Sequence, residues 1–182
     1  MTCAKNLCII AIAAMGLAAC VTPPPAGKIS DTAISQTTLS VAAQAVDICG
    51  RTFPNVTGTA EALQQAGFSE TAERFENGKE LDDPSRQVRV QVGERPAGGG
   101  RKEHVCLISV IGMTPEQGFA LAQPWVQRYG AITNAEAGQG LSPRAIQAWR
   151  SQTRDRIVFI AARKANNAFR QAGASVRLIF IQ

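Results

Sequence analysis

The sequence predicts an α+β domain built from an antiparallel sheet of about five strands, with helices on one face. Two observations predict it. Apolar residues recur at helical spacing in three segments, and they alternate with polar residues or run together in five shorter segments. The shorter segments follow one another over brief connections, which favours antiparallel pairing, and helices packed on one side of such a sheet give the α+β class.

The first two helices are marked by their capping residues. Ser30 is a suitable N-cap with Asp31 in the first turn, and an apolar stripe then runs to Gly50, where we expect the helix to stop. A short helix is expected over residues 57–66, closed by Gly67. The polar and acidic segment that follows, up to residue 86, is expected to be a surface loop.

The third helix has the clearest start and end. Thr114-Pro115-Glu116-Gln117 is typical of a capping box with proline at the first helical position. Gly130 ends the segment. We therefore expect a helix between these signals.

Five strands are expected. The segment 141–151 is ambiguous because Ser142-Pro143 is also a helix start, but a strand is favoured because a compact turn follows it. The resulting ββαβββ order is similar to profilin-like sheets, an analogy in topology that names no function. The expected strands are 87–92, 105–111, 141–151, 154–163 and 176–181.

The N-terminus carries the most specific motif in the chain. The first twenty residues read MTCAKNLCIIAIAAMGLAAC. An apolar run of about a dozen residues is too short to span a bilayer as a helix and is typical of a signal peptide. The run ends at Leu17-Ala18-Ala19-Cys20, which resembles the lipobox of bacterial lipoprotein precursors. This resemblance implies a signal peptide over residues 1–19 and acyl chains on Cys20 that hold the mature protein on a membrane.

The segment after the lipobox predicts how the domain is held. Residues 20–29 form the lipid-bearing N-terminus and a proline-rich tether, and residues 30–182 form a single domain. Val21 stands where lipoproteins retained in the inner membrane commonly have Asp. The resemblance therefore favours the outer membrane, with the domain facing the periplasm.

The remaining cysteines predict a disulfide. Cys3 and Cys8 lie in the expected signal peptide and Cys20 is expected to be acylated. Cys49 and Cys106 are then an even pair in an oxidising compartment, so we expect them to be bonded.

A metal site is the alternative for the same cysteines. His104 and Cys106 point to one face of a strand, and Cys49 and Met113 would complete a soft site for copper or zinc. Against it stand the lone histidine and the absence of CxxC or HxxxH spacing. We therefore expect neither a metal nor a cofactor.

Charge is unevenly distributed along a chain of net charge +5. Acidic residues dominate between residues 20 and 85, whereas from Arg144 onward Asp155 is the only acid among many arginines. Such basic strands are either solvated faces or a surface for anionic polymers. The candidate polyanion-binding residues are Arg154, Arg156 and Arg163.

The sequence contains no recognisable catalytic motif. It has one histidine, no GxSxG, and no CxxC among the expected mature cysteines, so we expect no enzyme. Nucleic-acid binding is not expected, because the few aromatic residues lie in apolar segments rather than among basic ones. Two functions are left: a non-catalytic lipoprotein that contacts envelope proteins or maintains the envelope, or a ligand- or polyanion-binding module that uses the basic C-terminal strands.

Overall fold

A computed structural model describes residues 34–73, 75–133, 145–164 and 173–182. These residues belong to one compact unit, Asp31–Gln182. The expected signal peptide, Cys20, the tether and the Ser30 cap lie outside the described residues.

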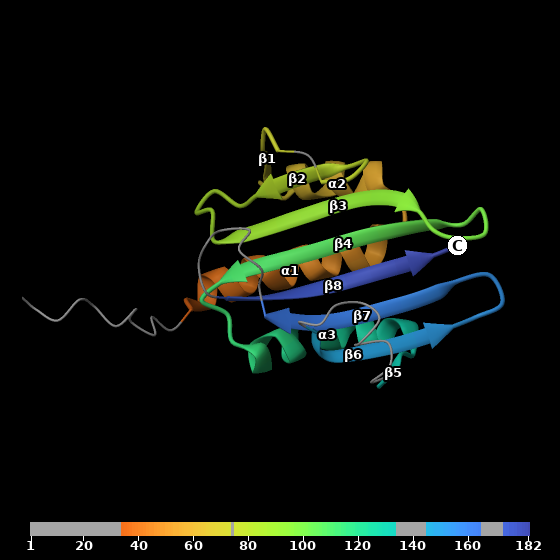
Figure 1. Ribbon diagram of the computed structural model, residues 1–182. Coiled ribbons are helices and arrows are strands. Elements are labelled where there is room, and N and C mark those ends of the chain that lie inside the picture. Colours follow the sequence, from red (N-terminus) through yellow and green to blue (C-terminus); the bar gives the residue numbers. More distant parts are fainter. Residues whose placement is uncertain (1–33, 74, 134–144, 165–172) are drawn as a thin grey trace, which may run out of the picture. The chain divides into compact units, whose positions relative to one another are not determined.

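The described residues form an eight-stranded antiparallel sheet in the order β1-β2-β3-β4-β8-β7-β6-β5 (Figure 1). The expectation of about five strands is therefore corrected. The five expected strands correspond to β3, β4, β6, β7 and β8. The three strands that were not predicted, β1, β2 and β5, are short. The strands are β1 (Ser69–Glu70), β2 (Lys79–Asp82), β3 (Val88–Pro96), β4 (Lys102–Ile111), β5 (Ile132–Thr133), β6 (Ala145–Gln152), β7 (Ile157–Lys164) and β8 (Gly173–Ile181).

The segment expected to be a surface loop contains β1 and β2. The sequence of β2 is Lys-Glu-Leu-Asp, yet Glu80 and Asp82 are only 2% and 8% exposed. Their carboxylates are buried because they pair with Arg89 on the neighbouring strand β3. The polar composition of this segment alone predicts a loop, because the residues that pair with its charged side chains lie on another strand.

Three helices pack on one face of the sheet: α1 (Gln36–Thr52), α2 (Val56–Gln65) and α3 (Pro115–Tyr129) (Figure 1). The core lies between the helices and alternate residues of the strands. Val90, Ile108 and Val176, each fully buried, stand side by side on β3, β4 and β8. No helix in the described part of the chain is long and apolar enough to cross a membrane.

Helix α1 differs from its predicted bounds at both ends. It is capped by Ser35, whose hydroxyl accepts a hydrogen bond from the Thr38 amide at 3.0 Å. It continues past Gly50 to Thr52, so Gly50 is not a stop. A Cβ at Gly50 would lie 3.0 Å from the indole of Trp125, so the glycine allows α1 and α3 to pack closely.

Helix α3 confirms its predicted capping signals. Thr114 and Gln117 form a reciprocal capping box, and Gly130 ends the helix with a left-handed backbone. Its aromatic residues bind it to α1. Buried Trp125 donates its Nε1–H to the Val46 carbonyl at 2.7 Å, and the Tyr129 hydroxyl donates to the Gly50 carbonyl at 2.8 Å.

Replacement of Gly173 tests how closely the central strands approach. A Cβ on Gly173 would lie 2.3 Å from the Val110 carbonyl oxygen of β4, whereas a Cβ on exposed Gly98 would meet nothing within 4 Å. Gly173→Ala is expected to lower the free energy of unfolding by about 1–3 kcal/mol because backbone must move. Gly98→Ala is the control and should leave it nearly unchanged. Urea denaturation measures both, and equal stability of the two variants would contradict this packing.

Candidate functional site

The predicted disulfide is confirmed. Cys49 on α1 is bonded to Cys106 on β4, with a Cα–Cα distance of 6.5 Å, and both residues are fully buried. Because the bond occupies both sulfurs, neither is available as a thiolate ligand. The alternative metal site with His104 and Met113 therefore does not form, and no group of three or more metal-ligating residues occurs among the described residues.

His104 lies on the helix-facing side of β4. It is 8% exposed, and its Nδ1 is 3.7 Å from the Glu94 carboxylate, which also pairs with Lys102 at 3.1 Å. Its neighbour Glu103 points to the opposite face, as alternation along a strand predicts. The two side chains are thus separated by the sheet.

The opposite side of the sheet, which we term the second face, carries most of the charged strand residues. It consists of the residues that alternate with the core positions. Five arginines and one glutamate are its main charged groups on the long strands: Arg89, Arg95, Glu103, Arg150, Arg163 and Arg177.

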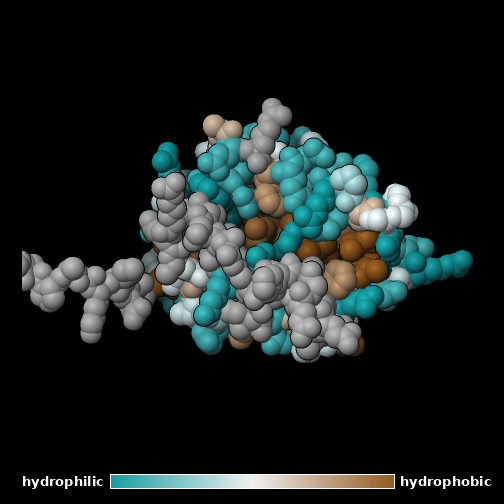
Figure 2. Space-filling view, viewed as in Figure 1, coloured by the Kyte–Doolittle hydropathy of each residue, from teal (hydrophilic) through white to brown (hydrophobic). Residues whose placement is uncertain are grey.

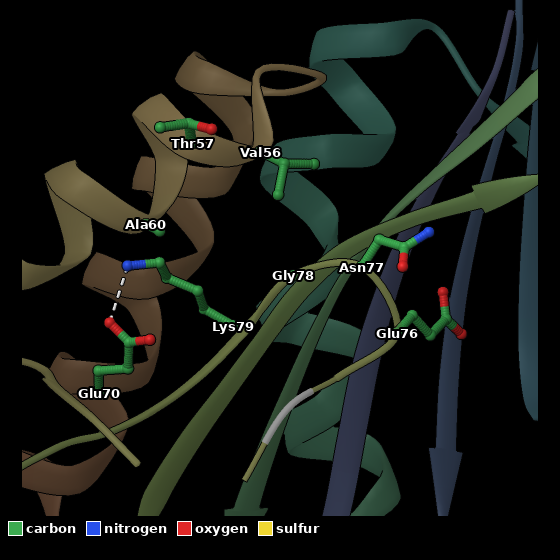
Figure 3. A pocket seen from close by; sticks show the side chains of 8 residues that line it. All are labelled: Val56, Thr57, Ala60, Glu70, Glu76, Asn77, Gly78 and Lys79. Carbon is green, nitrogen blue, oxygen red and sulfur yellow. Dashed lines mark hydrogen bonds and ion pairs between the residues drawn. The ribbon is translucent and has the colours of Figure 1, made fainter. Parts of the chain in front are cut away.

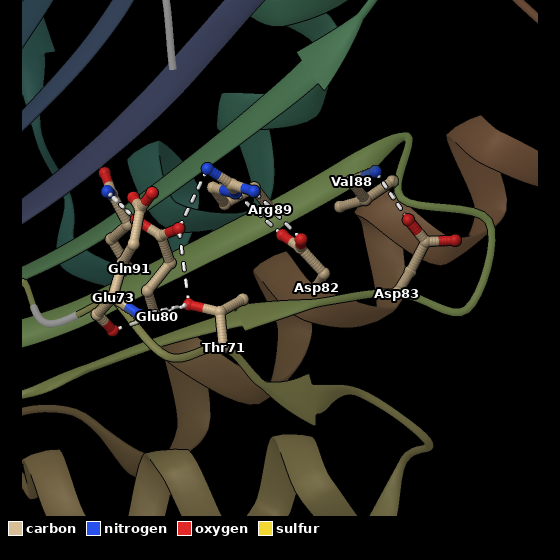
Figure 4. Close-up of polar contacts among 8 residues, drawn as sticks. All are labelled: Thr71, Glu73, Glu80, Asp82, Asp83, Val88, Arg89 and Gln91. Carbon is tan, nitrogen blue, oxygen red and sulfur yellow. Dashed lines mark hydrogen bonds and ion pairs between the residues drawn. The ribbon is translucent and has the colours of Figure 1, made fainter. Parts of the chain in front are cut away.

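One end of the second face forms a network of ion pairs and hydrogen bonds (Figure 4). Arg89 binds Asp82 through two hydrogen bonds of 2.7 and 2.9 Å and lies 2.8 Å from Glu80. Gln91 donates a further hydrogen bond to Glu80. The hydrogen bond to Asp82 raises the pKa of Arg89, although burial opposes it. Two carboxylates of β2 therefore share one arginine of β3.

A cavity of about 560 Å³ lies beside this network. Its acidic lining includes Glu80 and Asp82, whose carboxylates are directed to Arg89. Asp83 closes the turn into β3 by accepting hydrogen bonds from the Ser85 and Val88 amides at 2.9 and 2.6 Å. The polar groups here hold β2 against β3.

A second cavity, of about 350 Å³, lies between α2 and the start of β2 (Figure 3). Its charged residues are also paired with protein groups. Lys79 Nζ is 2.8 Å from Glu70, and Glu76 is 3.3 Å from Arg95. The charged side chains of this lining that are named here already form ion pairs within the protein, so they offer a ligand little unpaired charge.

The basic side of the second face is differently arranged. Arg177, at the centre of β8, is 9% exposed, and its Nε makes no hydrogen bond with any of the described residues. The Arg150 guanidinium lies 5.5 Å from the centre of the Phe159 ring. Hydrophobic side chains gather in the middle of this face, with hydrophilic ones around them (Figure 2).

The three predicted polyanion-binding residues do not form one cluster. Arg154 and Arg156 lie in the exposed turn before β7, and Arg156 is directed over Phe180, whose ring belongs to the helix-facing core. Arg163 lies near the far end of β7, roughly 20 Å away at the usual rise of a strand. It belongs to the second face, where Arg150 and Arg177 lie on the neighbouring strands.

Sequence reasoning did not select Arg150 and Arg177 as site residues. Alternation indicates which residues of one strand share a face, but the alignment of faces between strands depends on register. The register pairs Ala161 of β7 with Arg177 of β8, and this brings the three arginines to one side.

Comparison with family models, with curated proteins and with solved structures found no match.

Removal of the disulfide is expected to destabilise the domain. The bond closes a loop between residues 57 positions apart, for which loop entropy gives about 4 kcal/mol. The double variant Cys49→Ala, Cys106→Ala should therefore unfold at a lower urea concentration than the parent. A reducing agent should lower the parent's midpoint and leave that of the double variant unchanged. A parent insensitive to reduction under unfolding conditions would contradict this role.

The turn at Asp83 predicts an acid-sensitive contribution to stability. Burial raises the pKa of this carboxyl, but hydrogen bonds from Ser85, Val88 and Gln87 outweigh it and hold the pKa below its ordinary value. A carboxyl whose pKa is lowered in the folded state stabilises the folded protein at pH values above the pKa of the unfolded state. This stabilisation is lost as the pH falls through the pKa of the folded state.

Asp83→Asn is therefore expected to reduce the free energy of unfolding near neutral pH by about 1–3 kcal/mol. The further decrease in stability of the parent below about pH 4 should be smaller in this variant, because the variant lacks the carboxyl that titrates. Urea unfolding at several pH values measures this. Parallel pH profiles for the parent and the variant would exclude the assigned role.

Proposed function

We propose that the protein is a lipoprotein of the bacterial envelope, anchored through acylated Cys20, whose domain is a non-catalytic interaction module. The observation that carries this proposal is the buried Cys49–Cys106 disulfide. Such bonds form and persist in oxidising compartments and are rare in the cytosol. A buried disulfide agrees with the export that the lipobox-like segment implies.

The tether supports work close to the membrane. Residues 22–28 contain three consecutive prolines, and an extended proline-rich segment of this length spans about 20 Å. A domain held so closely contacts molecules at the membrane surface or proteins embedded there. With Val21 after the acylated cysteine, the proposed location is the periplasmic side of the outer membrane.

The non-catalytic role is supported by the position of the lone histidine. His104 is buried beside a carboxylate that also pairs with Lys102, and Glu103 lies across the sheet from it. The cysteines of the core are bonded to each other. The residue types that most often supply acid–base or nucleophilic catalysis are here engaged in structure.

A second candidate function is anion binding by the C-terminal strands. The observation that favours it is the convergence of Arg150, Arg163 and Arg177 on one face of β6, β7 and β8. The two functions are compatible, because an anchored module can act by binding an anionic component of its surroundings.

Substitution of Cys20 tests the anchoring. Cys20→Ala is expected to abolish palmitate incorporation and to leave the protein either unprocessed or in the soluble fraction, because the acyl acceptor is missing. Cell fractionation, electrophoretic mobility and metabolic labelling measure this.

Cys8→Ala is the matched control, since it removes a cysteine from the segment that is expected to be cleaved off. This variant should remain labelled and membrane-bound. A Cys20→Ala protein of mature size that stays in the membrane fraction would overturn the proposal.

A further inference from the structure

Arg177 is a buried cation at the centre of the second face. Its residue is 9% exposed, and its Nε–H donates no hydrogen bond within the part of the chain that the structure describes. A buried guanidinium ordinarily finds partners for its five N–H donors, because an unmade hydrogen bond to a charged group is costly. Among the described residues the guanidinium therefore lacks one hydrogen-bond partner, and this observation points to an anionic ligand.

The counter-charge of Arg177 is shared with another arginine. The Glu103 carboxylate lies 3.6 Å from the Arg177 guanidinium but 2.6 Å from that of Arg95. Burial lowers the pKa of Arg177, and the positive charges of Arg163 and Arg95 lower it further, against the opposing effect of Glu103. By contrast, the hydrogen bond to Glu103 raises the pKa of Arg95. Glu103 thus neutralises Arg95 more than it does Arg177.

Apolar residues border Arg177 on both neighbouring strands. Leu107 of β4 and Ala161 of β7 stand directly opposite it on the two neighbouring strands. Phe159 follows on the same face of β7, and both Leu107 and Phe159 are half-buried rather than fully enclosed. Ser109 and Ser175 lie on the other side of Arg177, both buried. A hydrocarbon group can therefore contact the same surface as the guanidinium.

Two further arginines flank this position. Arg163 is on β7 and Arg150 is on β6, with the Arg150 guanidinium stacked over the Phe159 ring. Both point to the second face, and among the described residues around Arg177 the arginines outnumber the carboxylates. A ligand with one anionic group is attracted to the region before it meets Arg177.

We propose that the second face binds an anionic amphiphile of the membrane, with its phosphate or carboxylate head at Arg177 and its hydrocarbon against Leu107 and Phe159. Arginine suits either head group, since its planar fork makes paired hydrogen bonds to both. The choice of a membrane amphiphile rests on the proposed anchoring, which holds the domain within about 20 Å of the lipid surface.

The experiment measures thermal unfolding of the full-length protein in nonionic dodecyl maltoside micelles, to which dodecyl phosphate is added. The unfolding midpoint should rise by about 5–10 °C at a concentration a hundredfold above the dissociation constant. Dodecyl trimethylammonium carries the same chain with the opposite charge and should give no rise. Inorganic phosphate, which lacks the chain, should give a much smaller one.

Two variants assign the effect to the site. Arg177→Met keeps an unbranched apolar stem without the guanidinium, leaves Glu103 paired with Arg95, and should abolish the rise caused by dodecyl phosphate. Glu103→Gln removes the competing carboxylate and should strengthen binding several-fold. Arg154→Ala, in the exposed turn before β7, is the control and should respond as the parent does.

Three outcomes would overturn the proposal: no rise with dodecyl phosphate, an equal rise with the cationic amphiphile, or a full rise in Arg177→Met. An equal rise with inorganic phosphate would overturn the part assigned to the hydrocarbon. Because the protein is already in micelles, none of these results depends on acylation of Cys20. Failure here is therefore distinguishable from failure of the anchoring.

Discussion

The sheet is continuous only because its last strand, β8, returns to pair with β4. This antiparallel pairing runs from Glu103–Ile181 to Ile111–Gly173 and joins the N-terminal strands β1–β4 to the C-terminal strands β5–β8. It is also a contact between residues far apart in the sequence, so it forms at a considerable cost in chain entropy. Both faces of the molecule depend on it. The core row of Val90, Ile108 and Val176 and the second-face pair Leu107 and Arg177 exist only in this register.

The helices stabilise the same β4–β8 pairing from one side of the sheet. The disulfide fixes α1 to β4, while α3 packs on β7 and β8. Helices α1 and α3 are in turn held together by the indole hydrogen bond of Trp125 and by the close approach at Gly50. The chain therefore links the two halves of the sheet twice, once through the strand pairing and once through the helices. A covalent bond within this layer limits separation of α1 from the sheet even when local packing is weakened.

The sequence predicted those features whose signals are local. Alternation and continuous apolar runs identified the long strands, the Thr114 capping box identified α3, and the count of cysteines identified the disulfide. Apart from the disulfide, which the number of cysteines left in the expected mature chain indicates, features that depend on a partner elsewhere in the chain were missed. The sequence predicts a loop at β2 because its carboxylates pair with Arg89 only in the folded sheet. It predicts a helix end at Gly50 because the residue that Gly50 packs against, Trp125, lies 75 residues further along the chain. The same reason explains why Arg177 was not selected: its neighbours are set by register between strands.

The uneven charge of the sequence has a structural consequence that composition alone does not indicate. The two acidic residues of β2, Glu80 and Asp82, both pair with the single Arg89 of β3, within their own half of the sheet. These carboxylates are thus directed to Arg89 and not to the arginines of β6 and β7, which lie beyond β4 and β8 in the sheet. Glu103 on β4 is the carboxylate that reaches across, and it is nearer to Arg95 than to Arg177. A fold that kept these arginines only for solubility would place them in water, as it places Arg154 in an exposed turn. Burial of Arg177 at the centre of the sheet costs desolvation that one shared carboxylate offsets only in part, and the anionic ligand that we propose would supply the missing counter-charge.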